Sequence, residues 1–123
     1  MALAKNLVGA GFSPGQACAI GGTAFNTGIV AAGAAIAAAT ALTADANFVG
    51  TATNGQGVQL YNGAIGDEQY VFNDGTLATI VVYPPTGSRI NGLAASAGIN
   101  LPSNSAAMFK KMTATRWFCL MSA

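Results

Sequence analysis

The chain has 123 residues, enough for one domain, and 52% of them are hydrophobic while only 7% are charged. A typical soluble domain carries about 25% charged residues. The net charge of +1 excludes a basic footprint for nucleic acid or an anionic membrane, and the absence of histidine removes the commonest general base and metal ligand. So few charges favour a surface covered by partners, because charged residues are depleted from interface cores. The alternative is a β-protein kept soluble by Ser, Thr, Asn and Gln.

Residues 1–27 are predicted to form an N-terminal arm with a short helix. Ser13 is a good N-cap, Pro14 suits the first helical position, and Gly21-Gly22 ends the helix. The segment is too small to have a core of its own, so it is predicted either to dock on another molecule or subunit or to cap the open end of the domain. The candidate interface residues are Leu3, Leu7, Val8, Phe12 and Ile20.

Residues 28–46 are rich in alanine, glycine and threonine and have two interpretations. Alanine favours a helix, whereas the spacing of Ile36, Thr40 and Leu42 places larger side chains on one side of an extended segment. We expect extended structure around Ala37–Leu42. A membrane-spanning helix is not expected, because glycines and threonines interrupt a run that would need about 20 predominantly apolar residues.

The clearest strand signals lie between residues 60 and 92. Residues 70–72 and 79–83 are aromatic and β-branched, which suits a pleated, half-buried surface. Asn73, Asp74 and Gly75 separate them and tolerate the positive φ of tight turns. The sequence therefore predicts a β-hairpin with its turn at these three residues.

Further short strands are predicted on both sides of this hairpin, with turn signals every 8–12 residues, as is typical of a sandwich or barrel. The predicted fold is mainly β: a small antiparallel β-sandwich or barrel at 28–123, with the short helical arm at 1–27. The additional predicted strands lie near 48–52, 58–60, 89–93, 98–101, 107–112 and 116–121.

No catalytic or metal-binding constellation is found in the sequence. The four carboxylates, Asp45, Asp67, Glu68 and Asp74, are dispersed and lie beside turn residues. Cys18 and Cys119 lack metal-ligand spacing. They are expected to be buried free thiols, with a disulfide between them left open. The sequence therefore predicts no enzymatic activity, no cofactor and no metal.

Six short segments carry a resemblance to a known family: residues 41–47, 57–60, 82–87, 90–92, 109–111 and 114–117. These segments resemble the small virion proteins of tailed bacteriophages, namely the head decoration (cement) and head-fibre-like proteins. This resemblance covers roughly residues 30–123. It implies a compact, non-enzymatic β-domain on the outer surface of the capsid, forming a homo-oligomer, often a trimer, bound to the major capsid protein.

A fibre or tail module that binds a host receptor or glycan is the alternative function. Such a module would use aromatic side chains as a stacking platform, so it predicts that they are exposed. The candidates are Trp117 and the tyrosines Tyr61, Tyr70 and Tyr83, although their distribution over different elements favours a core or interface role for them.

Overall fold

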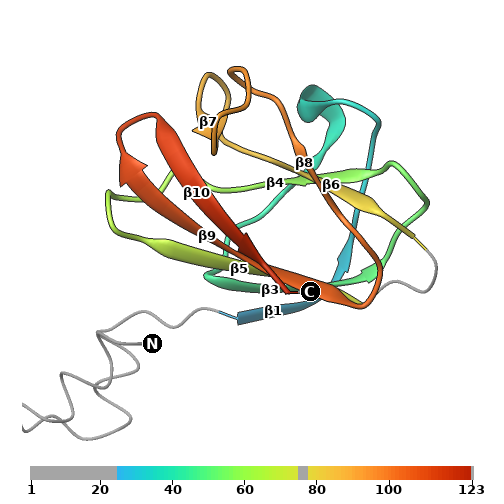
Figure 1. Ribbon diagram of the computed structural model, residues 1–123. Coiled ribbons are helices and arrows are strands. Elements are labelled where there is room, and N and C mark those ends of the chain that lie inside the picture. The colour runs from blue at the N-terminus through green and yellow to red at the C-terminus, as the bar shows by residue number, and fades with distance from the viewer. Residues whose placement is uncertain (1–24, 75–77, 123) are drawn as a thin grey trace, which may run out of the picture.

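The computed structural model describes residues 25–74 and 78–122, which form two facing β-sheets (Figure 1). The larger sheet has six strands in the order β1-β3-β5-β9-β10-β7, and the smaller has four in the order β2-β4-β6-β8. The elements in chain order are β1 Phe25–Val30, η1 Ile36–Ala38, β2 Thr40–Ala41, β3 Ala46–Thr51, β4 Gly57–Gln59, β5 Glu68–Asn73, β6 Ile80–Tyr83, β7 Arg89–Ile90, β8 Ile99–Leu101, β9 Ser105–Thr113 and β10 Arg116–Met121.

From β1 to β6 the chain winds as a short solenoid. Successive strands alternate between the two sheets, so each strand pairs with the one that lies two elements earlier. The pairs β1–β3, β3–β5, β2–β4 and β4–β6 are all parallel. Parallel neighbours cannot be joined by a tight hairpin, and here each connection runs through the opposite sheet.

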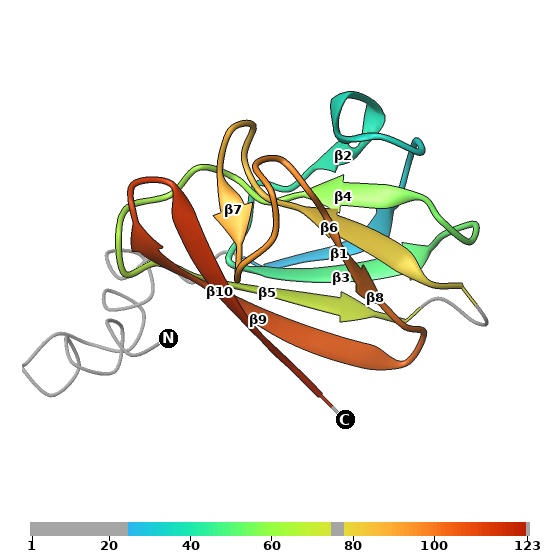
Figure 2. The same cartoon turned by 45° about the horizontal axis from the view of Figure 1, so that its top comes forward.

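The C-terminal strands close this winding in antiparallel fashion. β8 pairs with β6, β9 pairs with β5, and β10 returns along β9 (Figure 2). The prediction of a mainly β fold is thus confirmed. The prediction of an antiparallel sandwich or barrel is wrong for the first six strands, because short strands separated by turn residues look alike in sequence whether they turn back or cross to another sheet.

The predicted hairpin is also wrong, although both of its strands exist. β5 belongs to the six-stranded sheet and β6 to the four-stranded sheet, so they are not paired with each other. The side chain of Asn73 stabilises the passage of the chain from β5 to the other sheet. Its buried amide donates to the carbonyl oxygens of Ala78 (2.8 Å) and Leu101 (3.0 Å). Gly75, the third predicted turn residue, lies outside the described residues.

The segment around the predicted domain boundary is part of the body. β1 spans that boundary, since Phe25 and Asn26 before it pair with β3, as Ile29 and Val30 do after it. Extended structure is confirmed for Thr40–Ala41 and wrong for Ala37 and Ala38, which belong to the single 3-10 turn η1. The predicted arm helix and its interface residues, Leu3, Leu7, Val8, Phe12 and Ile20, lie outside the described residues.

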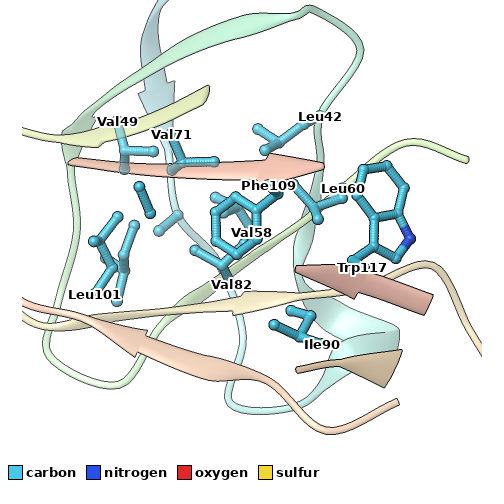
Figure 3. Packing of buried hydrophobic residues seen from close by; sticks show 13 residues of the cluster. Leu42, Val49, Val58, Leu60, Val71, Val82, Ile90, Leu101, Phe109 and Trp117 are labelled. Carbon is cyan, nitrogen blue, oxygen red and sulfur yellow. The ribbon is translucent and has the colours of Figure 1, made fainter. Parts of the chain in front are cut away.

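The hydrophobic core fills the space between the two sheets (Figure 3). Phe109 lies near its centre, and Trp117 and Ile90 close the end where β10 meets β7. Burial of each such side chain contributes about 1.5–3 kcal/mol. Within the described residues, no helix is long and apolar enough to cross a membrane. The other large core side chains are Leu42, Val49, Val58, Leu60, Val71, Ile80, Val82 and Leu101.

Candidate functional site

The side of the six-stranded sheet that faces away from the core, here called the outer face, carries many apolar side chains. Strand alternation produces it: Phe109 and Trp117 point into the core, so their neighbours on β9 and β10 point outward. Leu120 is 68% exposed and Phe118 is 45% exposed. The outer face comprises Phe25, Phe48, Glu68, Tyr70, Phe72, Ala106, Met108, Lys110, Phe118 and Leu120.

Three phenylalanine rings form a ladder across the first strands of this face. The rings of Phe48 and Phe72 are stacked with centroids 4.6 Å apart, and Phe25 meets Phe48 edge-on at 5.4 Å. Phe48 and Phe72 are paired in the parallel register of β3 and β5. The ring spacing therefore follows from the strand spacing of about 4.8 Å.

The ladder stops at β9, where the residue paired with Phe72 is Ala106. The missing side chain leaves an open hollow of about 270 Å³ beside the Phe72 ring. Ser122 closes one side, since its amide donates to the carbonyl oxygen of Ala106 (2.8 Å) and its hydroxyl accepts from the Ala106 amide (2.9 Å). The hollow is lined by Phe48, Phe72, Asn73, Asp74, Asn104, Ser105, Ala106 and Ser122.

The charges at the other end of the outer face are matched within the molecule. Lys110 and Glu68 form an ion pair at 3.6 Å, and the Tyr70 hydroxyl donates to Glu68 (2.8 Å). That hydrogen bond, with some burial, raises the pKa of Tyr70. The Arg116 guanidinium lies 5.1 Å from the centre of the Phe118 ring.

A second polar cluster, around Lys111, serves the fold. The buried Lys111 ammonium donates to the Asn62 side-chain oxygen and to the Gly63 carbonyl, both at 2.7 Å, and lies 6.0 Å from the centre of the Trp117 ring. In the same loop, the Tyr61 hydroxyl donates a hydrogen bond to Asp45. The pKa of Tyr61 is raised mainly by burial and further by this hydrogen bond. These contacts fix the loop between β4 and β5 against the end of the core.

The predicted turn residues and aromatic platform do not form one site. Asn73 is buried between the sheets, while Asp74 lies at the rim of the hollow. Trp117 is fully buried, which contradicts its predicted exposure as a platform. The tyrosines are partly buried, and their hydroxyls are hydrogen-bonded to Asp45, Glu68 and the Ala34 carbonyl.

The outer face was missed from the sequence, although one signal for it is present. In the segment 116–121, assigning Trp117 to the core sends Phe118 and Leu120 outward together.

The described residues contain no group of three or more potential metal ligands. No protein-family model and no curated protein sequence matches the chain.

Proposed function

We propose that this protein is a non-enzymatic structural component of a bacteriophage virion that decorates the outer surface of the capsid. The observation that carries the proposal is the exposed apolar outer face on a rigid two-sheet body. Monomeric soluble proteins rarely expose contiguous apolar patches larger than a few hundred Å², and larger patches mark interaction sites. The sequence resemblance to head decoration and head-fibre-like proteins supplies the location.

In this role the protein acts as a homo-oligomer that bridges subunits of the major capsid protein. Binding to the assembled shell alone stabilises that shell by mass action, because the bound state exists only when the subunits are in place. No cofactor is required. The proposed anchor on the capsid is the part of the predicted arm that precedes β1, residues 1–24, which has apolar side chains and a single lysine.

Cryo-electron microscopy of virions, and of undecorated capsids mixed with the purified protein, tests this function. We expect regularly spaced density on the outer surface of the shell and a higher temperature of capsid disruption. Density confined to the tail, or none on the virion, would refute the proposal.

A receptor- or glycan-binding fibre module is the second candidate, and one observation favours it. The hollow beside Phe72 combines a ring face with the polar side chains of Asp74, Asn104 and Ser122, which can pair with hydroxyl groups. A glycan array compares the wild-type chain with Phe72→Ala. Binding by the wild type that Phe72→Ala abolishes would support this candidate, and silence of the wild type would rule it out.

A further inference from the structure

We propose that the outer face packs against the same face of a second copy, with Phe118 of each copy entering the hollow beside Phe72 of the other. This contact specifies how the proposed homo-oligomer forms, yet it does not depend on capsid binding. It is isologous, meaning that the same surface is used by both copies about a twofold axis. It replaces the threefold arrangement implied by the sequence resemblance with a twofold one.

The strand registers divide the outer face into rows that run across the strands. Tyr70, Met108 and Leu120 are paired with one another and form the central row. The row on one side holds Phe72 and Ala106, and the row on the other side holds Phe118, with Glu68 and Lys110. Each step along a strand between rows is two residues, or about 6.6 Å. The hollow and the Phe118 ring thus lie at equal distances from the central row.

A twofold axis along the central row brings these two features together. Rotation about that axis places each strand of the second copy over the same strand of the first copy, running in the opposite direction. The same rotation exchanges the two flanking rows. Phe118 of β10 then lies over the β10–β9 end of the opposite row, where Ala106 and Ser122 form the floor and side of the hollow. The central row, including the highly exposed Leu120, packs on its own copy.

Two charges at the ends of the outer face fit the same arrangement, while Lys110 and Glu68 are paired with each other within one copy. Asp74 lies at the hollow, and Arg116 accompanies the Phe118 ring at 5.1 Å. Rotation about the central row places the arginine end of one copy at the aspartate end of the other, twice in each pair. Opposite charges that meet across an interface fix its register, whereas like charges would oppose it. A second copy therefore supplies both the ring and the cation that this hollow and its rim can accept.

The first measurement is the mass of the full-length protein in solution, by light scattering and sedimentation equilibrium. We expect a mass of two copies for the wild type and of one copy for Leu120→Ser and for Phe118→Ser. Leu93→Ser is the matched control, because Leu93 is 38% exposed in the loop after β7 and should leave the mass at two copies. Circular dichroism and thermal melting verify that each variant is folded.

The second measurement addresses the hollow and its rim without removing apolar surface. Ala106→Leu fills the hollow from an outward-facing position and is expected to give single copies. Asp74→Lys and Arg116→Glu should each weaken pairing at least tenfold, and the double variant Asp74→Lys/Arg116→Glu should recover most of the loss.

Several outcomes would overturn this proposal. They are a wild type that stays a single copy, a mass of three copies, unchanged pairing in folded Phe118→Ser and Ala106→Leu, or no recovery in the double charge variant. Loss of capsid binding with pairing intact would refute the proposed function and leave this contact standing. Phe72-dependent glycan binding by a single-copy wild type would assign the hollow to the second candidate function instead.

Discussion

At the scale of single residues, buried polar side chains hold the two sheets together. Asn73 lies at the end of β5 and reaches carbonyl oxygens that belong to the neighbourhoods of β6 and β8 in the other sheet. Asn47 of β3 makes similar contacts, donating to the Ala44 carbonyl just before the strand (2.8 Å) and to the Tyr70 carbonyl of β5 (3.2 Å). Buried carbonyl groups that lose their partner cost more than the hydrogen bond itself contributed.

We expect Asn73→Ala to lower the free energy of unfolding by about 2–4 kcal/mol, because two buried carbonyl groups would lose their donor. Chemical denaturation measured by Trp117 fluorescence gives this value. Asn100→Ala is the control: Asn100 is exposed in β8, and its replacement should change stability by less than about 0.5 kcal/mol. Equal effects of the two substitutions would contradict the bridging role of Asn73.

Cys119 provides a test by pH. It is a free thiol packed against the core, and burial raises its pKa from 9.0 to about 11. Because the folded pKa lies above the unfolded one, the thiol's contribution to stability is complete below pH 9 and is lost as the pH rises through 11.

In a Cys18→Ser background we therefore expect Cys119 to react slowly with iodoacetamide at pH 8, and faster as the pH approaches 11. The difference in unfolding free energy between this protein and its Cys119→Ala derivative should narrow over the same interval. Rapid alkylation at pH 8 in a protein that remains folded would show that the thiol is not buried as described.

At the scale of the elements, the sequence predicted most strands but not their partners. The residues of β5, β6, β9 and β10 carry aromatic and β-branched side chains or alternate in polarity, and these local patterns depend on each strand alone. Pairing depends on where the chain goes after each turn, and Asn73-Asp74 fits a crossing as well as a hairpin. The outer face could not be predicted because it joins strands that are far apart in sequence, β3, β5, β9 and β10.

Two glycines within strands show how closely the elements pack. A Cβ atom added to Gly57 in β4 would lie 2.5 Å from the Tyr83 ring and 3.0 Å from the Val81 carbonyl oxygen, whereas one added to Gly50 in β3 would meet nothing within 4 Å. We expect Gly57→Ala to destabilise the fold by about 1–3 kcal/mol because the neighbouring strand must move.

Gly50→Ala should be neutral or stabilise the fold by up to about 1 kcal/mol, by restricting the unfolded chain. Thermal unfolding of the two variants under identical conditions makes the comparison. Equal melting temperatures would indicate that β4 and β6 are farther apart than the structure places them.

At the scale of the whole molecule, the scarcity of charge has a structural counterpart. The larger sheet has an apolar inner face, which builds the core, and an outer face that is also largely apolar. The smaller sheet covers the inner side, while the outer side carries exposed apolar side chains such as Phe118 and Leu120. The composition favoured a surface covered by partners, which stays a prediction, whereas the strands that carry the apolar outer face could be identified only from the tertiary structure.

We expect a chain that begins at Ala24 to fold and melt like the full-length protein, because both sheets and the core lie within residues 25–122. If the residues that precede Ala24 are the anchor, the same truncated chain should no longer bind undecorated capsids, as measured by cosedimentation. Undiminished binding would assign the anchor to the body, and failure to fold would show that the removed residues belong to the core.

The antiparallel closure of the solenoid also governs how the protein is made. β5 needs β9 on its open edge, and the two are separated by more than thirty residues of chain that must first leave the ribosome. Until then a nascent chain presents the open edge of β5, with the phenylalanine ladder beside it. Unpaired edges of this kind template aggregation. Synthesis that stalls before residue 105 is therefore expected to release fragments that aggregate. Formation of β9 and β10 covers the open edge of β5 and so prevents this aggregation.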